Sequence, residues 1–179
     1  MRKIVRKLIP VWKVHEEEAW LNSMADAGWK LCHVSFCKYE FESCEKGAYR
    51  IRVELLEKNF DQPETADYLA FMEETGAQVT ARWMRWAYFA RPAELGEFEL
   101  YSDRASRLKY MKRLMQFVGT VTAANLYIGL YNMWLLFGMG SGVNVLGFLN
   151  LLIGVFGAVG LWKMYKGCKA LQAEGELFE

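Results

Sequence analysis

Charge is missing from a long stretch of this 179-residue chain. Residues 115–162, 48 in a row, contain no Lys, Arg, Asp, Glu or His. One membrane-spanning helix needs roughly 20 apolar residues, so the stretch is long enough for two. A helical hairpin buried in a soluble protein would keep a polar outer face, and neither half of the stretch has one. The sequence therefore predicts a two-helix transmembrane hairpin.

Motifs for chemistry are also missing. The phosphate-binding strings GxGxxG and GxxxxGK[ST] do not occur, and neither His15 nor His33 has a catalytic partner at a motif spacing. No two of the four cysteines have CxxC spacing, so free thiols are expected, and a zinc site formed with the two histidines is the less favoured alternative. These cysteines are Cys32, Cys37, Cys44 and Cys168. We therefore expect no catalytic residues, no metal site and no cofactor.

An export signal is absent from the start of the sequence, because the apolar run Leu8–Trp12 is cut short by Lys13. The amino-terminal part is therefore expected in the cytoplasm. Basic residues flank the uncharged stretch on both sides, at Arg104, Arg107, Lys109, Lys112, Arg113, Lys163, Lys166 and Lys169. By the positive-inside rule, both termini of this multi-pass protein are expected to be cytoplasmic.

Net charge differs between the two parts of the chain. Residues 1–102 hold 14 Lys and Arg against 17 Asp and Glu, a net charge of −3, while residues 103–179 hold 8 against 4, a net charge of +4. An acidic soluble part argues against direct nucleic-acid binding. The basic residues lie where anionic lipid headgroups are expected.

Glycines divide the uncharged stretch at Gly138–Gly142, which predicts a tight turn. We expect transmembrane helices at 117–137 and 143–162. A basic juxtamembrane helix at 103–116, capped by Ser102, is expected to continue into the first of them, and a cytoplasmic tail at 163–179 to follow the second.

Small and polar residues recur on one face of each expected transmembrane helix. The first face holds Thr122, Asn125, Gly129 and Asn132, and the second holds Asn144, Gly147, Asn150, Gly154 and Ala158. Lipid offers no partner to a carboxamide, so the two faces are expected to pack together with asparagines bonding across the gap. These small and polar residues cover more of the two helices than the contact within one helix pair needs. We therefore expect the surplus to be buried in a homo-oligomer or in a hetero-complex with another protein.

The amino-terminal part repeats itself with an offset of 48 residues. The segment 16–31 matches 64–79, including Trp20 with Tyr68, Met24 with Met72 and Gly28 with Gly76. Each copy predicts a helix opened by acidic residues and ended by a glycine with positive φ, followed by two strands. The fold class expected for residues 1–92 is α+β, a duplicated β-α-β-β (ferredoxin-like) antiparallel sheet with both helices on one face. Residues 93–102 are expected to form a linker.

Aromatic residues are dense in this part of the chain. The candidates for a ligand or partner face are Trp12, Trp29, Tyr39, Tyr49, Trp83, Trp86 and Tyr88. Half of the positions of a sheet face away from its helices, so some rings could line a pocket or a partner surface there. The favoured interpretation is that they fill the core and a dimer interface, because aromatic residues are common in strands.

Three sequence elements carry a resemblance to a known family: G-W-x-L at Gly28, G-x-Y-x-x-R at Gly47 and Y-F-x-x-P at Tyr88. Together with the two apolar segments they make the chain similar to the domain of unknown function 2812 family. That resemblance implies a bacterial cell-membrane protein, often encoded beside a PadR-type transcription regulator. It also implies an accessory or sensory role without assigned catalytic residues.

Two functions remain open from the sequence. The first is a regulatory accessory protein whose cytoplasmic domain binds a protein partner while the hairpin holds it at the membrane. The second is a small-molecule sensor, since duplicated β-α-β-β units occur in effector-binding domains; this rests on analogy of fold alone.

Overall fold

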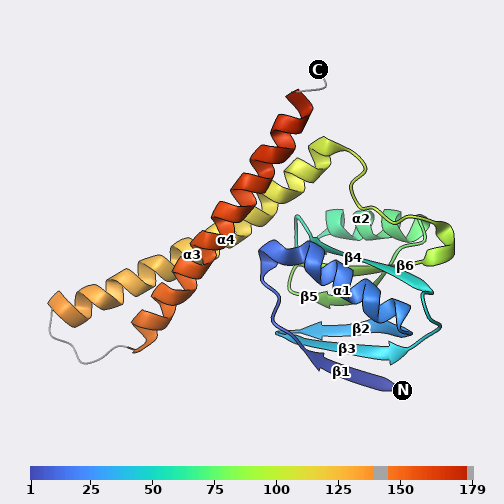
Figure 1. The fold of residues 1–179 in the computed structure, drawn as a ribbon, viewed down its shortest axis with the longest axis horizontal. Coiled ribbons are helices and arrows are strands. Elements are labelled where there is room, and N and C mark those ends of the chain that lie inside the picture. The colour runs from blue at the N-terminus through green and yellow to red at the C-terminus, as the bar shows by residue number, and fades with distance from the viewer. Residues whose placement is uncertain (139–144, 177–179) are drawn as a thin grey trace. The chain divides into compact units, whose positions relative to one another are not determined.

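The computed structural model describes residues 1–138 and 145–176 and divides the chain into two compact units, Met1–Ser102 and Asp103–Glu179 (Figure 1). The turn predicted at Gly138–Gly142, apart from Gly138, and Asn144 of the predicted packing face lie outside the described residues. Each unit is described by itself below.

The first unit has the element order β-α-β-β twice. The first run is β1 (Arg2–Arg6), α1 (Val14–Asp26), β2 (Trp29–Ser35) and β3 (Lys38–Ser43), with a 3₁₀ turn η1 (Val11–Lys13) before the helix. The second run is β4 (Tyr49–Leu55), α2 (Pro63–Glu74), β5 (Gln78–Trp83) and β6 (Trp86–Pro92). This mixed α and β content and the antiparallel pairing agree with the predicted class.

The strands form two three-stranded sheets instead of the single sheet that the sequence predicted. Their orders are β1-β3-β2 and β4-β6-β5, with β2 and β5 as the neighbouring strands of the two sheets. The helices do not share a face: α1 lies between the sheets, and α2 covers the opposite face of the second sheet (Figure 1). As a result β6 is covered on both sides, and residues 86–90 are all buried.

Glycine ends both helices of the first unit, as predicted. Gly28 has φ +87° and follows α1, and Gly76 has φ +84° and follows α2. In this left-handed region a Cβ atom collides with the backbone, so glycine is the residue of lowest cost. Acidic residues in the first turn, Glu16 and Glu64 among them, favour the positive end of each helix.

Residues 93–102, expected as a linker, contribute to the core of the first unit. A 3₁₀ turn, η2 (Ala93–Leu95), leads into Phe98, which is only 5% exposed and packs in a cluster with Met72, Ala77 and Phe89. Tyr101 also points inward and donates a hydrogen bond to Glu54. The first unit therefore extends to Ser102.

The second unit consists of two long helices, α3 (Arg104–Gly138) and α4 (Val145–Glu176). The predicted juxtamembrane helix is continuous with the apolar segment that follows it. Asp103, and not Ser102, caps α3, because its Oδ1 accepts the Ser106 N–H at 2.8 Å. The helix α4 continues past 162 as far as Glu176, into the segment expected as a tail. Arg104 donates to the Gln172 carbonyl at 2.5 Å, so the start of α3 lies beside the end of α4.

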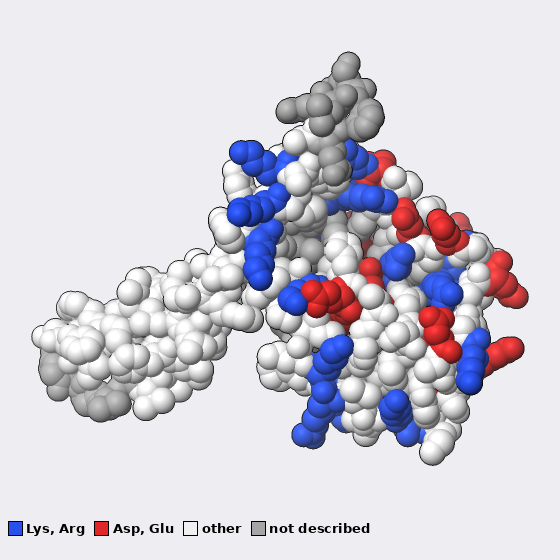
Figure 2. Space-filling view, in the orientation of Figure 1, with Lys and Arg blue, Asp and Glu red and all other residues white. Residues whose placement is uncertain are grey.

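Figure 2 shows that charge is confined to one end of this helix pair, and that its other end is free of Lys, Arg, Asp and Glu. Within the described residues, α4 alone is long and apolar enough to cross a membrane, at Val145–Ala173, in which an 18-residue window has a mean hydropathy of 2.1. The mean hydropathy of α3 is too low for the same assignment, because Asn125, Asn132 and threonines lie in its apolar half.

Candidate functional site

The structure does not bring the seven candidate aromatic residues together on one open face. Tyr39, Trp86 and Tyr88 are buried. The other four are half-buried: Trp12, Trp29, Tyr49 and Trp83. Because alternate residues of a strand point to opposite faces, Trp86 and Tyr88 both turn toward the side where α1 lies. These three rings therefore serve the core, which agrees with the interpretation that the sequence favoured.

The exposed face of the first sheet is charged. Glu40 of β3 lies opposite Ile4 of β1 and His33 of β2 in the strand register. The Lys38 ammonium contacts the Glu40 carboxylate at 2.6 Å, and this hydrogen bond lowers the pKa of Glu40 from its ordinary value. This face is therefore unsuited to an apolar ligand.

A buried carboxylate joins α1 to both sheets. Glu17 is 8% exposed, and its Oε1 accepts the Tyr39 hydroxyl of β3 at 2.7 Å and the Tyr88 hydroxyl of β6 at 3.0 Å. Burial raises the pKa of Glu17 because removal from water disfavours the charged form, and the two tyrosine hydrogen bonds only partly oppose this effect. The pKa of Tyr39 is raised as well, first by burial and then by the Glu17 charge.

The sequence contained a signal for this carboxylate. The buried stripe of α1 is Val14, Glu17, Leu21, Met24 and Ala25, so Glu17 occupies an apolar position at helical spacing. A carboxyl group at such a position requires hydrogen-bond donors from the packing partners, and the tyrosines provide them. Tyr39 and Tyr88 were predicted as candidates, but Glu17 was not.

A second carboxylate lies on the opposite face of the second sheet. Glu54 of β4 is 3% exposed; its Oε2 accepts the Tyr68 hydroxyl of α2 at 2.7 Å, and its Oε1 accepts the Tyr101 hydroxyl. This pair of hydrogen bonds fastens α2 and the segment 93–102 to the sheet. No pattern in β4 distinguishes Glu54, because it shares its face with Arg50 and Arg52.

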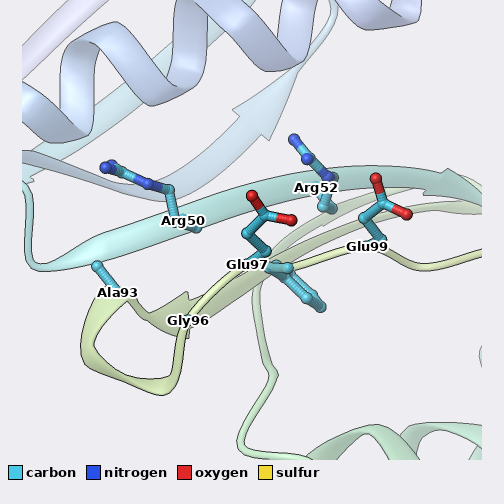
Figure 3. Close-up of a pocket in the computed structure, with 7 residues that line it drawn as sticks. Arg50, Arg52, Ala93, Gly96, Glu97 and Glu99 are labelled. Carbon is cyan, nitrogen blue, oxygen red and sulfur yellow. The ribbon is translucent and has the colours of Figure 1, made fainter. Parts of the chain in front are cut away.

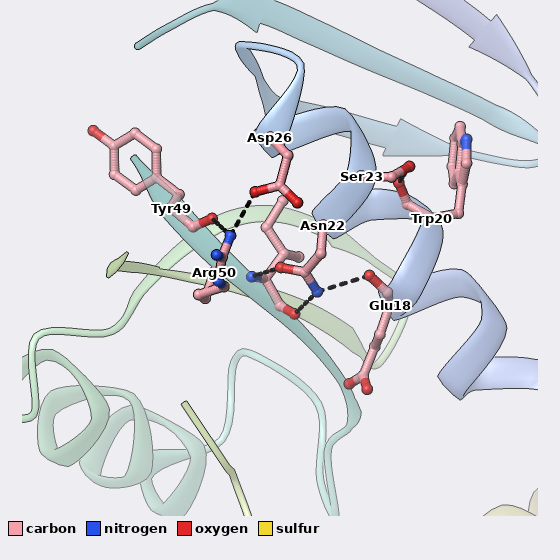
Figure 4. Close-up of polar contacts among 8 residues, drawn as sticks. Glu18, Trp20, Asn22, Ser23, Asp26, Tyr49 and Arg50 are labelled. Carbon is pink, nitrogen blue, oxygen red and sulfur yellow. Dashed lines mark hydrogen bonds and ion pairs between the residues drawn. The ribbon is translucent and has the colours of Figure 1, made fainter. Parts of the chain in front are cut away.

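The outer edge of β4 is occupied by side chains of α1 (Figure 4). Asn22 accepts the Ile51 N–H at 2.9 Å and donates to the Ile51 carbonyl at 3.0 Å, and Glu18 accepts the Val53 N–H at 2.8 Å. Arg50 donates to Asp26 at 2.8 Å beside them. These groups occupy the backbone positions that a neighbouring strand would need, so α1 protects this edge from further strand pairing.

A cavity of about 480 Å³ lies over β4 and the segment that follows η2 (Figure 3). Its lining is Arg50, Arg52, Ala93, Gly96, Glu97, Phe98 and Glu99. In Figure 3 the carboxylates of Glu97 and Glu99 extend to the same side of the segment as the two arginines of β4. Charges of both signs therefore meet in a cavity with a single aromatic ring in its lining, which suits a polar surface better than an apolar molecule.

The thiols and imidazoles do not assemble into a reactive group. The four cysteines are free, and within residues 1–138 and 145–176 there is no group of three or more His, Cys, Asp or Glu placed to hold a metal ion. The His15 side chain is 92% exposed and lies 3.7 Å from Glu18. Burial raises the pKa of the Cys32 and Cys44 thiols, which lowers their nucleophilic character at neutral pH.

Small residues form the contact between α3 and α4. A Cβ atom placed on Gly129 would meet the Leu151 side chain at 2.7 Å, one on Gly154 would meet Leu126 at 2.5 Å, and one on Gly147 would meet Asn132 at 2.7 Å. Thr122 is 5% exposed and faces a further glycine, Gly157. The predicted faces therefore meet at most of the described positions.

One position of the predicted packing face is wrong. Ala158 is exposed, and the buried positions next to it are Gly157 and Gly160, because the buried stripe of α4 follows a spacing near seven residues per two turns. Asn125 and Asn132 each donate from Nδ2 to the carbonyl four residues earlier in α3, at 2.8 and 2.7 Å. Bonding across the helix pair stays a prediction. Asn150 is half-buried.

Comparison with protein families identifies residues 13–123, more than half of the chain, as a match to the family described as "Protein of unknown function (DUF2812)". The chain belongs to the DUF2812 family. Comparison with curated proteins gave no match, and comparison with solved structures gave none either.

The DUF2812 match covers the features on which the site depends. It runs from the start of α1 into α3 and includes both buried carboxylates, their four tyrosine donors and the charged cavity. The strand β1 and the helix α4 lie outside it. The family match thus covers most of the first unit and the beginning of the helix pair.

Proposed function

We propose that this DUF2812 protein is a non-enzymatic accessory protein of the bacterial cell membrane, whose first unit binds a protein partner in the cytoplasm in a regulatory or sensory role. The observation that carries the proposal is the combination of a helix pair with one uncharged end and a separate unit whose cavity is charged. The helix pair supplies attachment, and the cavity offers both signs of charge to a polar partner.

The proposed attachment is a transmembrane hairpin with spans at 117–137 and 143–162 and both termini in the cytoplasm. It is supported by the pairing of α3 with α4 and by basic residues at the ends remote from the turn. An engineered Ser141→Cys should react with a membrane-impermeant thiol reagent on intact cells, whereas Cys37 should react only after the cells are opened. The reverse pattern contradicts the proposed orientation.

The proposed partner surface is the rim of the cavity formed by Glu97 and Glu99. Both side chains are exposed, and reversing both charges should weaken a complementary contact. We would crosslink the full-length protein in membranes and compare E97K/E99K with the matched control E73K/E74K, which reverses two exposed charges on α2. Loss of the crosslinked partner in the first variant alone supports the proposal. Equal recovery from both variants contradicts it.

The small-molecule sensor remains the alternative, and the observation that relates to it is the buried Glu17 carboxylate. Glu17 is a single carboxylate among aromatic rings, as a pocket for an apolar cation would require, but here its oxygen is already bonded to Tyr39 and Tyr88. A ligand would have to replace one of these hydroxyl groups. The partner-binding proposal needs no such rearrangement and is therefore preferred.

We also infer that the first unit arose by duplication of a β-α-β-β segment of ferredoxin-like type. The two sheets share one strand order, and both contain a register shift at positions 48 apart, Leu31/His33 and Val79/Ala81. Edge-to-face ring pairs are also equivalent, Trp20 with Phe41 and Tyr68 with Phe89.

Association in the membrane, as a homo-oligomer or with another protein, is part of the same proposal. Exposed apolar side chains cover the outer faces of both helices, and Asn150 is half-buried within a single helix pair. The double variant N132L/N150L should reduce association measured by crosslinking in membranes while the protein stays membrane-bound. Unchanged assembly would show that the two amides are not needed for it.

A further inference from the structure

Exposed apolar side chains gather at one end of the first unit, where three chain segments meet. Phe36 in the β2–β3 turn is 73% exposed, Met84 in the β5–β6 turn is 70% exposed, and Leu8 after β1 is 71% exposed. The centres of the Phe36 and Trp83 rings lie 6.2 Å apart, which places the two turns side by side. The Lys7 N–H donates to the Cys37 carbonyl at 3.0 Å and brings Leu8 to the same place. We call Leu8, Phe36, Trp83 and Met84 the tip patch.

Each of the two turns has a non-glycine residue at a position of positive φ, where glycine would adopt the backbone conformation at lower cost. Ser35 pairs with Lys38 and Trp83 with Trp86, so each turn has two central residues. Cys37 has φ +54° and Met84 has φ +52°, in the left-handed region where glycine or asparagine is usual in such turns. The side chain of Met84 is 70% exposed and is therefore available for contact with something outside the unit.

Basic residues lie in the segments that carry the tip patch. The three segments that meet there, 4–8, 35–39 and 82–86, contain five basic residues and no Asp or Glu. Lys38 is paired with Glu40, and Arg85 donates to the Leu56 and Glu57 carbonyls, so the charge that an outside partner would meet comes from Arg6, Lys7 and Arg82. Over residues 1–102, by contrast, acidic residues outnumber basic ones by 17 to 14. Apolar and aromatic tips beside basic residues are the composition of surfaces that insert into the interface of an anionic membrane.

We propose that the tip patch inserts into the headgroup region of an anionic lipid bilayer and docks the first unit on the membrane. The inference rests on the membrane attachment proposed above. Because Ser102 ends the first unit and Asp103 caps α3 directly, no linker separates this unit from the helix pair. Attachment would therefore keep the patch at high local concentration near the headgroups. A second copy of the patch is the poorer occupant, because the basic residues of two copies would repel each other.

The test uses the full-length chain in nanodiscs made of phosphatidylcholine alone, or of equal amounts of phosphatidylcholine and phosphatidylglycerol. An environment-sensitive dye is attached at Phe36→Cys after the native cysteines have been replaced by alanine or serine. Phe71→Cys on α2 is the matched control, because Phe71 is also an exposed aromatic residue, at 58%. A second label at Met84→Cys repeats the measurement independently.

With phosphatidylglycerol, we expect the dyes at 36 and 84 to emit at shorter wavelength and to be quenched by lipids that carry a spin label near the headgroup. The dye at 71 should stay in water under both conditions. The variant R6Q/K7Q should lower the ratio of docked to undocked protein about fivefold for each charge removed, the factor that corresponds to roughly 1 kcal/mol per basic residue near an anionic surface.

Each contrary result has a defined meaning. Dyes at 36 and 84 that remain as exposed to water as the dye at 71, in chains that have entered the nanodiscs, overturn the docking of the patch but leave the attachment standing. Shielding that is the same with and without phosphatidylglycerol shows that the patch does not require anionic lipid, and shielding that grows with the protein-to-lipid ratio shows that another protein molecule covers it; either result overturns the proposal. Failure of the chain to enter nanodiscs contradicts the attachment and the docking together.

Discussion

The first unit and the α3–α4 helix pair are packed with opposite kinds of residue. The core of the first unit depends on large rings: Phe41 and Phe89 are both 0% exposed, and each makes an edge-to-face contact with an aromatic ring of a helix. The helix pair depends on glycines such as Gly129 and Gly154, whose missing side chains leave room for leucines of the facing helix. Sheets and helices are separated by layers that large side chains must fill, whereas two helices approach closely only over small residues.

This difference predicts opposite sensitivities. Removing atoms should damage the first unit most, and adding atoms should damage the helix pair most. The four predictions below test this contrast, beginning with the largest expected effect.

Truncation of Phe89 should produce the largest loss. Phe89→Ala removes a fully buried ring that packs on Tyr68 and should lower the free energy of unfolding of the first unit by about 3–5 kcal/mol. Phe41→Ala in the other sheet is the matched variant and should cost a similar amount. Urea unfolding of the full-length protein in micelles, followed by tryptophan fluorescence, measures both. A cost below about 1 kcal/mol for either variant would show that its ring is not a core element.

Enlargement of Gly154 should destabilise the helix pair. In Gly154→Leu the new side chain meets Leu126, whose Cγ would lie 2.7 Å from the Cβ atom, and overpacking of this kind costs about 1–3 kcal/mol. Gly167→Leu is the control, since its nearest contact, Met111 Cε, is at an ordinary 3.4 Å. Spin labels at the exposed positions 121 and 159 report the separation of the helices. Equal distances in the two variants would contradict the close contact.

Replacement of Gly76 should separate backbone cost from packing cost. Gly76 and Gly47 both have positive φ, +84° and +69°, but a Cβ atom at Gly76 would lie 2.7 Å from Leu95 Cδ1, whereas the nearest atom to one at Gly47, Asp26 Oδ1, would lie at an ordinary 3.7 Å. Both valine variants pay the left-handed backbone cost of about 1–2 kcal/mol, and only Gly76→Val also displaces Leu95. Urea unfolding should therefore find Gly76→Val the less stable of the two. The opposite order would contradict the contact with Leu95.

The smallest effect should be the pH dependence that Glu17 confers. Burial raises the pKa of Glu17, so the folded state holds this proton more tightly than the unfolded chain. The contribution of Glu17 to stability is therefore full below about pH 4.5, close to the ordinary pKa of a glutamate, and is lost as pH rises through the raised pKa. Glu17→Gln does not titrate and keeps an oxygen that can accept from Tyr39 and Tyr88.

The stability of Glu17→Gln relative to the parent should thus increase as pH rises from about 4 to 8. Urea unfolding of both proteins at matched pH values measures this difference, and contributions from other groups cancel in it. A difference that stays constant over the whole range would show that Glu17 has the same proton affinity in the folded and unfolded states.

Local features of the chain could be predicted well from the sequence. The positive φ of Gly28 and Gly76, the continuity of α3 and most of the small residues between the helices follow from helical spacing and backbone sterics alone. The position of Ala158 was wrong by one residue. A face assigned at an ideal 100° per residue drifts from the seven-residue spacing that two packed helices adopt.

Longer-range features could not be predicted in this way. The burial of Phe98 and Tyr101 depends on contacts with Met72 and Glu54, which lie far from them in the chain. The split into two sheets also has no local signal, because it depends on α1 inserting between them instead of sharing a face with α2.

The sequence by itself determined the order of helices and strands in the first unit, the glycines that end its helices and the stretch from which charge is excluded. These properties depend on neighbours within one or two turns of chain, so spacing reveals them. Only the tertiary structure decided that Tyr39 and Tyr88 meet at Glu17 and that Leu8, Phe36 and Met84 share one exposed end. Burial of a carboxylate and convergence of separate turns depend on which distant segments pack together, and the free energy of that packing is distributed over the whole core.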